Sequence, residues 1–273
     1  MQKVSIVTIS FNQARYLEAA IESVLQQDHP SIEYIVVDPG STDGSRDIIE
    51  RYRGRIFKIV YEPDEGPADG LNRGFDSATG DIFGCLNADD VLLPGAVSSA
   101  VKELERPDLD VVCGDGYFID GEGNIQRRCF STNFSARRFA LGGAVLMQQS
   151  SFWRSGWHRK VGGFNIRNRT SWDGEFFFQI ALAGGKFRHV HEYWSCFRIH
   201  RQSITGSGLA NAEYEADRQR MIGARFASYG RLLPLAQRAA RAMKFIEDPR
   251  IVPLRLSERI FGPPKLRSPS KIA

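Results

Sequence analysis

Two adjacent carboxylates, Asp89 and Asp90, come after Asn87 and Ala88 at the end of the apolar run at residues 82–86. Carboxylate oxygens at the end of a strand can hold Mg²⁺ or Mn²⁺, and phosphate oxygens of a substrate can complete the coordination shell. The same spacing suits a turn in which the aspartates cap a helix that begins near Pro94. A metal site and a helix cap therefore both stay open on spacing alone.

Asp173 and His200 are further candidates for chemistry. Asp173 precedes an apolar helix predicted over residues 174–183, where its carboxylate could act as a general base toward a hydroxyl. A helix cap is the alternative, and this segment alone favours it. His200 lies between an apparent strand and a Gly/Ser-rich segment, where an imidazole could bind a metal or a phosphate. A lone histidine is more often structural.

Asp38 ends another apolar run and opens into the loop PGSTDG at residues 39–44. This loop could hydrogen-bond a ribose or a base edge, although Asx and glycine turns of this kind are common without a ligand. Two phosphate-binding motifs are missing, because the turn SFNQARYL has no glycine and no G-x-x-x-x-G-K-[ST] occurs. Dinucleotide-binding and P-loop folds are therefore disfavoured.

Strand and helix patterns alternate in the first half of the chain, which predicts an α/β fold with a mostly parallel sheet flanked by helices. Strands are predicted over residues 4–9, 34–37, 56–61, 82–86 and 109–113, and helices over 16–25, with Asn12 as N-cap, 45–53 and 68–78. Ligands bind outside the carboxyl ends of such strands, where the candidate loops gather together with Glu62-Pro63-Asp64. Beyond residue 115 the pattern is less regular, with one further helix predicted over 137–147.

The 273-residue chain is polarised in charge. Its total is 36 − 32 = +4, but residues 1–223 carry 25 − 29 = −4 and residues 224–273 carry 11 − 3 = +8. An acidic body makes nucleic acid a poor candidate partner. The basic end is predicted to be helical and broken by prolines, and it could dock on anionic lipid or be a solvated tail. Both interpretations stay open.

Four separated cysteines without metal-type spacing indicate buried reduced thiols, as in cytosolic proteins. The longest apolar stretch, residues 139–147, is about half of the ~20 residues that a spanning helix needs. No secretory signal pattern opens the chain. We therefore expect a soluble cytoplasmic protein, with peripheral contact at the inner face of the membrane as an option.

Five segments together resemble one known family: VSIVTISFNQARYLEAAIESVLQQ, YIVVDPGSTDGSRDII, EPDEGPADGLNRGF, ATGDIFGCLNADD and VGGF…WDGEFFFQIALAGG. Their order and spacing across about residues 3–205 are similar to bacterial family 2 glycosyltransferases with the GT-A fold. The resemblance implies inverting, hexosyltransferase-type transfer from a nucleotide-sugar donor, with a divalent metal (Mn²⁺ or Mg²⁺) at the donor diphosphate. It also implies a saccharide or lipid-linked acceptor of bacterial surface polysaccharide or glycan synthesis.

The resemblance assigns roles by position. It places Asp173 as the catalytic base, and Asn87 stands where the family has the first aspartate of D-x-D, which removes one negative charge. The implied donor-binding residues are Thr8, Ser10, Phe11, Asn12, Asp38, Gly40, Asp69, Asn87 and Ala88; the implied metal ligands are Asp89, Asp90 and His200; the implied acceptor-binding residues are Trp172 and Gln149. Residues 203–208 (SITGSG) are expected to form a lid over bound donor.

The predicted organisation is a GT-A domain over residues 1–223 and a basic helical extension over 224–273. Within the domain, residues 1–115 would bind the nucleotide-sugar and residues 116–223 would form a less regular acceptor half. Two other functions remain: a nucleotidyltransferase, although SFNQARYL lacks a glycine- and basic-rich triphosphate loop, and a catalytically silent binding subunit, for which Asn87 is the hint.

Overall fold

The computed structural model describes residues 2–201, 203, 211–226 and 232–264. The expected lid over residues 203–208 lies outside this description, apart from Ser203. The described strands are β1 (Val4–Ile9), β2 (Ile32–Val37), β3 (Lys58–Val60), β4 (Ile82–Asn87), β5 (Val91–Leu92), β6 (Val111–Ile119), β7 (Ile125–Cys129), β8 (Ser151–Arg154) and β9 (Phe187–Arg198). They form a single sheet in the order β3-β2-β1-β4-β8-β6-β9-β5, with β7 paired to β6.

The first half of the sheet is parallel, as the alternating pattern predicts. β1 pairs with β2 and β4, and β2 pairs with β3, all in parallel register. The connecting helices are α1 (Ala14–Leu25), α2 (Ser45–Arg51) and α3 (Pro67–Asp76). Because these strands run in one direction, the loops after β1, β2, β3 and β4 meet at one edge of the sheet.

The second half of the sheet is mixed. β8 lies antiparallel between β4 and β6, whereas β6 and β9 are parallel. The helices of this half are α4 (Ala96–Leu104), α5 (Ala136–Ala140), α6 (Gly156–Val161) and α7 (Trp172–Leu182). The short 3₁₀ turns are η1 (Arg53–Arg55) and η2 (Gln148–Ser150). The structure thus matches the expected α/β class, with a less regular second half.

Hydrophobic side chains fill both faces of the sheet. α1, α2 and α4 pack on one face, and α3, α6 and α7 pack on the other. The second face is rich in aromatic rings: Trp153 is fully buried, with ring centroids 5.5 Å from Phe75 and 5.2 Å from Phe176. Truncating such a ring to alanine costs about 3–5 kcal/mol of stability. This packing fixes the start of α7 beside the sheet edge.

Two local predictions are wrong. The helix expected over residues 137–147 ends at Ala140, because Gly142 adopts φ +69° and Gly143 lies so close to Ala240 that a Cβ would meet its backbone oxygen at 2.6 Å. The N-cap of α1 is Gln13 rather than Asn12. The strand expected over residues 56–61 is confirmed only over Lys58–Val60.

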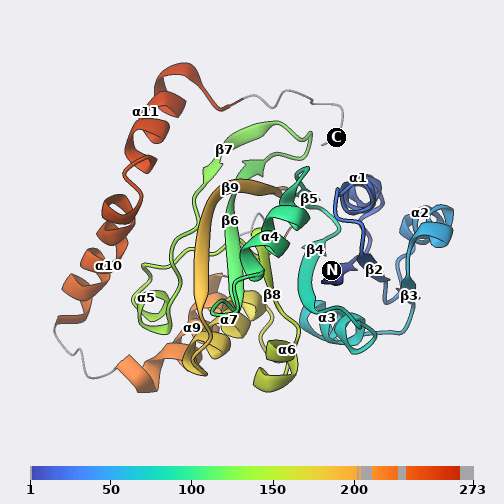
Figure 1. Cartoon of the computed structure of the whole chain (residues 1–273), viewed down its shortest axis with the longest axis horizontal. Coiled ribbons are helices and arrows are strands. Elements are labelled where there is room, and N and C mark those ends of the chain that lie inside the picture. Colours follow the sequence, from blue (N-terminus) through green and yellow to red (C-terminus); the bar gives the residue numbers. More distant parts are fainter. Residues whose placement is uncertain (1, 202, 204–210, 227–231, 265–273) are drawn as a thin grey trace.

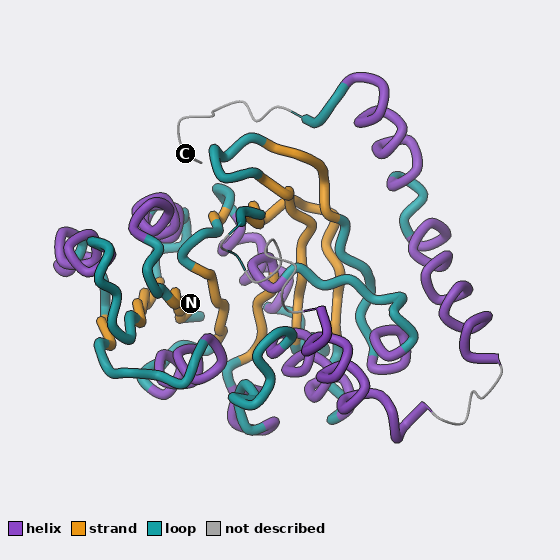
Figure 2. The backbone as a smooth tube through the Cα atoms, turned by 180° about the vertical axis from the view of Figure 1, so that it is seen from behind, coloured by secondary structure: helices purple, strands orange, loops and turns teal. Residues whose placement is uncertain are grey.

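The helices described after the sheet are α9 (Asn211–Phe226), α10 (Leu233–Glu247) and α11 (Ile251–Phe261). α10 and α11 lie along the side of the molecule remote from α1 and α2 (Figures 1 and 2). The division predicted after residue 223 falls within α9. Among the described residues, no helix has the length and apolarity needed to cross a bilayer. All four cysteines are buried and free, as expected.

Candidate active site

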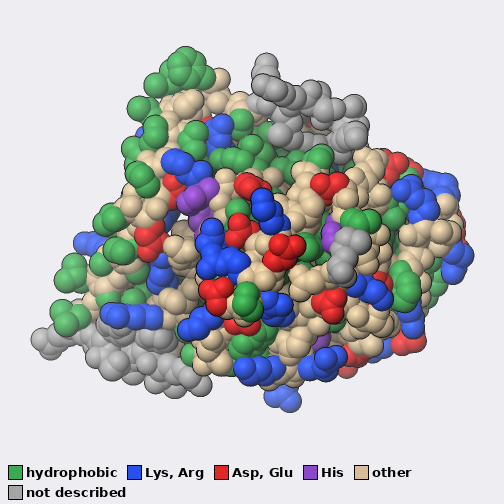
Figure 3. All heavy atoms as spheres, in the orientation of Figure 1, with side chains coloured by type: hydrophobic (Ala, Val, Ile, Leu, Met, Phe, Trp, Pro, Cys, Tyr) green, Lys and Arg blue, Asp and Glu red, His purple; other side chains and the backbone are tan. Residues whose placement is uncertain are grey.

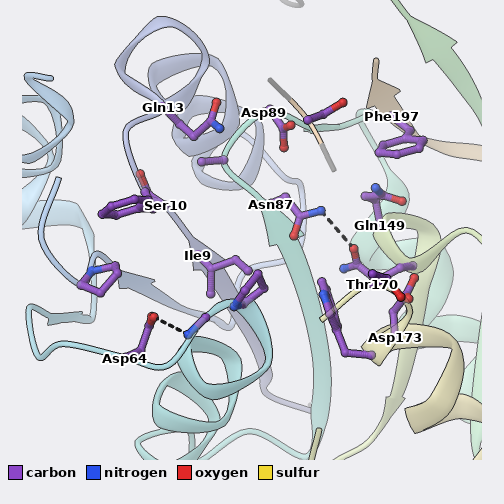
Figure 4. Close-up of a pocket in the computed structure, with 18 of the residues that line it drawn as sticks. Ile9, Ser10, Gln13, Asp64, Asn87, Asp89, Gln149, Thr170, Asp173 and Phe197 are labelled. Carbon is purple, nitrogen blue, oxygen red and sulfur yellow. Dashed lines mark hydrogen bonds between the residues drawn. The ribbon is translucent and has the colours of Figure 1, made fainter. Parts of the chain in front are cut away.

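One cavity of about 600 Å³ opens where the parallel strands end and α7 begins. This volume is typical of small-molecule sites. Asn87 lies between Ser10 and Asp64 on one side and Gln149, Thr170 and Asp173 on the other (Figure 4). Eight of the residues implied by the resemblance line it: Ser10, Phe11, Asn87, Ala88, Asp89, Gln149, Trp172 and Asp173.

The loop after β2 is organised by the buried carboxylate of Asp38. One oxygen, Oδ1, accepts hydrogen bonds from the backbone N–H groups of Gly40 (3.1 Å) and Ser41 (2.8 Å) and from Nε of Arg46 (3.1 Å). The other oxygen, Oδ2, and the hydroxyl of Ser10 are buried without a hydrogen-bond partner among the described residues. Buried polar groups are normally paired, so both atoms keep unused hydrogen-bonding capacity. Ser10 lines the cavity, whereas Asp38 is fully buried behind its wall.

Asn12 joins the first loop to the second. Its backbone N–H donates to Ser41 Oγ (2.8 Å), and its side-chain oxygen accepts from the backbone N–H of Thr42 (2.9 Å). Asn12 has φ +53°, unlike every other described non-glycine residue. Strained backbone of this kind concentrates at functional sites. The Phe11 ring beside it is 59% exposed and faces the cavity edge.

Thr8 and Asp69 lie away from the cavity surface. Thr8 is fully buried, and its hydroxyl accepts a hydrogen bond from Tyr34 (3.0 Å). Asp69, in the first turn of α3, accepts hydrogen bonds from the backbone N–H of Glu65 (2.9 Å) and from Nε of Arg73 (3.0 Å). In this structure both side chains support the loops rather than line the cavity.

Asp90 points into the protein behind the cavity wall. Its carboxylate accepts hydrogen bonds from the side chains of Asn87 (3.1 Å) and Gln149 (2.6 Å) and from the backbone N–H of Arg198 (2.9 Å). Burial, with the charge of Asp89 next in size, raises the pKa of Asp90 well above its usual range. Both oxygens of Asp90 are thus engaged within the protein.

Asp89 faces the cavity and meets His200. Its Oδ2 lies 3.0 Å from Nε2 of His200, although the two residues are 111 positions apart. Both side chains are largely buried, at 14% and 8% exposure, and the imidazole packs against Tyr16. The helix-cap alternative for Asp89 and Asp90 is wrong, because α4 begins at Ala96 with Gly95 as its N-cap and without a side-chain cap.

Asp173 lies in the first turn of α7, where its side chain borders the cavity beside Trp172. The helix-cap alternative is wrong here too, because the N-cap position is Ser171. Burial raises the pKa of the Asp173 carboxyl, and the backbone N–H of Gly174 opposes this effect. A carboxyl with a raised pKa is a stronger base once it is ionised.

Comparison with known proteins agrees with this geometry. Residues 5–205 match the family model described as glycosyl transferase family 2. The chain belongs to this family.

Individual relatives of this family 2 glycosyltransferase extend the match. An uncharacterised glycosyltransferase of Nostoc sp. is 30% identical over 231 residues, covering 80% of this chain and 71% of that protein. The Campylobacter jejuni GalNAc(5)-diNAcBac-PP-undecaprenol β-1,3-glucosyltransferase is 25% identical over 235 residues, covering 78% of this chain and 70% of that protein. The family match sets aside the nucleotidyltransferase alternative.

Solved structures show the same fold. S. aureus TarS in complex with UDP-GlcNAc superposes with a TM-score of 0.68 at 17% identity, covering 94% of this chain and 77% of that one. A mannosyltransferase from Pyrobaculum calidifontis in complex with GDP-Man and Mn²⁺ superposes with a TM-score of 0.61 at 18% identity, covering 95% and 80%. The chain spans 44% of a longer solved TarS chain. The expected GT-A fold is confirmed.

A network beside Asp173 in this family 2 glycosyltransferase has no counterpart in the sequence analysis. Glu175, on α7, is 7% exposed, and both of its oxygens bind the guanidinium of Arg220 on α9 at 3.1 and 3.0 Å. Side-chain amides of Asn165 (3.0 Å) and Asn168 (2.8 Å) also donate to it. Nothing in the local pattern indicates this pair, because its members are 45 residues apart.

Asp64 lines the cavity and has no role assigned by the resemblance. Its carboxylate accepts a hydrogen bond from the backbone N–H of Gly66 (2.9 Å), and burial raises its pKa. The signal was present, since Glu62-Pro63-Asp64 follows a predicted strand at the ligand-binding edge. Pro39 and Pro63, from the loops expected at this edge, also line the cavity. Lining residues outside the predicted loops and roles are Ile9, Gln13, Gly66, Pro67, Gln148, Thr170 and Phe197.

Proposed function

We propose that this glycosyltransferase moves a sugar from a nucleotide-sugar donor to an acceptor hydroxyl with inversion of configuration. The observation that carries the proposal is one cavity bordered by the nucleotide edge at Ser10, the carboxylate of Asp89 and the carboxylate of Asp173. Donor, diphosphate and acceptor thereby have adjoining places. Nucleotide-sugar complexes of fold relatives, with UDP-GlcNAc and with GDP-Man, support the choice of donor class.

Asp38 and Ser10 are proposed to bind the nucleoside. The buried, unpartnered oxygens of both side chains can exchange hydrogen bonds with base or ribose groups, while Gly40 and Asn12 shape the two loops. A ligand that satisfies such atoms removes the free-energy cost of leaving them unpaired, about 1–3 kcal/mol each. We propose that Asn87 and Ala88 contact the donor beyond them, because both line the cavity.

Asp89 and His200 are proposed to hold a divalent metal. A carboxylate oxygen and an imidazole nitrogen 3.0 Å apart fit Mn²⁺, which accepts both ligand types. Asp90, which the resemblance also implies as a ligand, has both oxygens engaged by Asn87, Gln149 and Arg198, so we propose that it anchors the loop that carries Asp89. When bound, the metal would offset the negative charge of the donor diphosphate and of the departing nucleoside diphosphate.

Asp173 is proposed to be the general base. It takes the proton of the acceptor hydroxyl while the oxygen forms a bond to the anomeric carbon. The bond from that carbon to the diphosphate oxygen breaks, and its electron pair leaves with the nucleoside diphosphate. Because attack and departure occur on opposite faces, the configuration inverts. Trp172 and Gln149 would position the acceptor, since both line the cavity near Asp173.

The test is release of nucleoside diphosphate from UDP-, GDP- and dTDP-sugars with saccharide and polyprenol-linked acceptors. We expect release with one base, loss of release with EDTA, and recovery with Mn²⁺. Asp89→Asn should abolish the response to Mn²⁺, whereas Asp108→Asn, in an exposed ion pair with Arg106, should keep wild-type behaviour. Absence of release with every donor and acceptor would instead support a catalytically silent binding protein.

We also propose that α10 and α11 rest on an anionic membrane surface, beside a lipid-linked acceptor. The printed name of the Campylobacter jejuni relative includes such an acceptor. Apolar side chains line the outer margin of this side of the molecule (Figure 3). They recur at helical spacing on both helices and are exposed by 42–83%: Leu235, Met243 and Ile246 on α10, and Leu256, Ile260 and Phe261 on α11.

On these helices the acidic side chains contact the rest of the protein, whereas several basic side chains are exposed to solvent. Glu247 pairs with Arg138 of α5, and Glu258 accepts from the backbone N–H of Arg128 on β7 (2.8 Å). Asp248, at the end of α10, is 4% exposed. The acidic residues of this segment therefore face the protein. Three cations of the same two helices are exposed: Arg238, Arg241 and Arg259.

Exposed apolar groups together with cations favour anionic lipid over water. In vesicle flotation we expect binding to membranes that contain anionic lipid and little binding to neutral ones. Reversing Arg238, Arg241 and Arg259 to Glu should weaken binding by at least about a hundredfold, at about 1 kcal/mol per cation. Arg106→Glu is the matched control. Vesicle binding that is unchanged in the triple variant would contradict the membrane assignment. So would a wild-type dimer that the three substitutions convert to a monomer, because the surface would then be a contact between two copies of the chain.

A further inference from the structure

A second group of potential metal ligands lies away from the cavity. Asp115 of β6 and His189 and His191 of β9 each offer one ligand atom, and these atoms lie within 4.8 Å of one another. The ring centroids of the two histidines are 4.6 Å apart, and the ring planes are nearly perpendicular, at 83°. None of these residues lines the cavity of the candidate active site. We call them the β9 histidine cluster.

The carboxylate of Asp115 is the buried centre of this cluster. Asp115 is 1% exposed, and its Oδ1 accepts a hydrogen bond from the backbone N–H of Ser131 (2.9 Å) and lies 2.7 Å from Nε2 of His189. Its Oδ2 is buried and has no hydrogen-bond partner in the described part of the chain. A buried carboxylate oxygen without a hydrogen bond is costly. The guanidinium of Arg250, 3.8 Å away, offsets part of that cost, and a metal ion in direct contact would lower it further.

The connection between α10 and α11 supplies the remaining neighbours. Asp248 Oδ2 lies 3.5 Å from Nδ1 of His191. Arg250 binds both oxygens of Asp248 at 2.7 Å, and its Nη2 lies 3.8 Å from Asp115 Oδ2. A small cavity of about 40 Å³ is bordered by His189, His191 and Asp248. Donor atoms of β6 and β9 thus lie close together, and the carboxylate of Asp248 adjoins this group at His191.

We infer that the β9 histidine cluster binds a zinc-class divalent cation, with Asp248 as a further ligand. Two imidazoles and a carboxylate suit Zn²⁺, Co²⁺ or Ni²⁺, whereas Mg²⁺ prefers an all-oxygen shell. Ligand atoms around tetrahedral zinc lie about 3.3 Å apart, so the cluster has to contract. His191, whose side chain is 47% exposed, can move inward. The bound ion would clip the α10–α11 connection to the sheet.

Arg250 competes with the metal in this arrangement. Its guanidinium partly balances the charges of Asp115 and Asp248 at 3.8 and 2.7 Å. Removing it by Arg250→Gln frees Asp248 and removes a repulsive cation. We therefore expect this substitution to tighten metal binding by roughly tenfold, whereas a merely structural role of the cluster predicts no tightening.

The experiment is a Co²⁺ and Zn²⁺ titration of the full chain carrying Asp89→Asn, which disables the proposed donor-side metal site. We expect one ion per chain, with Co²⁺ absorption bands of a tetrahedral nitrogen and oxygen site. His191→Gln, at an exposed position, and His189→Gln should each weaken binding at least tenfold. His29→Gln, whose imidazole contacts the Gln2 carbonyl, is the control.

Two further readouts make the outcome decisive. Zn²⁺ should slow proteolysis within α10 and α11 in the wild type and not in His191→Gln. The melting temperatures of the two proteins in EDTA should agree, which would show that the substitution leaves the metal-free fold intact. Binding that survives both histidine substitutions, or no binding at micromolar Zn²⁺, would overturn the inference. Neither result bears on the sugar-transfer proposal, because the active-site residues lie in a separate cavity.

Discussion

At the residue scale, Asn87, which stands where the resemblance implies an aspartate, has a structural role as an amide. Its amide N–H donates to the carboxylate of Asp90 at 3.1 Å, and Asp90 is fully buried. An aspartate at position 87 would place a second carboxylate beside the buried carboxylate of Asp90. Both burial and the repulsion between like charges would then disfavour their ionised forms. The amide keeps an oxygen for a ligand and removes this repulsion. The substitution is therefore compatible with an active enzyme.

Asn87→Asp should destabilise the protein despite restoring the D-x-D pattern. The pKa of Asp90 is already raised by burial, so the folded state binds protons more tightly than the unfolded state, and stability falls as pH rises. A second carboxylate adds to this effect. We expect a loss of about 1–3 kcal/mol at pH 8, with a smaller loss at pH 5.5, measured by urea unfolding.

Asn87→Ala is the matched control for this prediction. It removes the same hydrogen bond without adding charge, so its loss of stability should change less between the two pH values. An Asn87→Asp protein as stable as the wild type at pH 8 would show that Asn87 does not relieve repulsion at Asp90.

At the element scale, α9 is held against α7 beside the proposed base. The bidentate pair between Arg220 and Glu175 spans the two helices, and Thr170 donates a hydrogen bond to Asp217 of α9 at 2.9 Å. Burial opposes the charge on Glu175, but hydrogen bonds from Arg220, Asn168 and Asn165 leave its pKa lowered. The Arg220–Glu175 pair and the Thr170–Asp217 hydrogen bond, which we together call the α7–α9 strap, hold the start of α7 in place. This part of α7 carries Asp173.

Arg220→Ala should loosen the strap. Glu175 would keep its two amide partners and lose its charge partner; because Arg220 is 46% exposed, we expect a cost of only about 1 kcal/mol. The expected kinetic effect is a higher KM for the acceptor with donor affinity unchanged. Arg106→Ala, which breaks the exposed pair with Asp108, serves as the comparison. If the KM for the acceptor is unchanged in Arg220→Ala, the contact between α9 and α7 does not contribute to acceptor binding.

The elements also show how far sequence patterns reach. The parallel half was predictable because each strand is a short buried apolar run followed by an amphipathic helix, as with β1 and α1. β7 was not predictable, because its polar residues 126–128 break the apolar run. Residues 114–119 of β6 were not predictable either, because Gly114, Asp115 and Gly116 interrupt the apolar run although the strand is buried. Contacts that join distant segments, such as Asp89 with His200, came only from family resemblance, since spacing carries no signal for them.

At the scale of the whole molecule, the net charges of −4 on residues 1–223 and +8 on residues 224–273 belong to different parts of the surface. The acidic body includes the carboxylates at the cavity edge, where a metal ion would mediate contact with diphosphate. The basic end turns its acidic residues toward the body and exposes Arg238, Arg241 and Arg259. Donor chemistry and proposed membrane contact thus lie on different parts of the fold.

This separation predicts a selective effect of salt. Raising ionic strength from about 0.05 to 0.5 M shortens the screening length to a few ångströms and should reduce transfer to a polyprenol-linked acceptor embedded in anionic vesicles. Transfer to a water-soluble saccharide acceptor should change much less. Equal sensitivity of both reactions would place the effect of salt at the active site rather than at the membrane.

Asp173 is proposed to remove the acceptor proton in this cavity. The most direct measurement compares single-turnover sugar transfer by the wild type, Asp173→Asn and the surface control Asp108→Asn, together with donor affinity. We expect Asp173→Asn to transfer about 10²–10⁴-fold more slowly, with donor affinity within about twofold of the wild type and with no loss of thermal stability, because a buried charge has been removed. Transfer by Asp173→Asn at a near-wild-type rate would contradict the account.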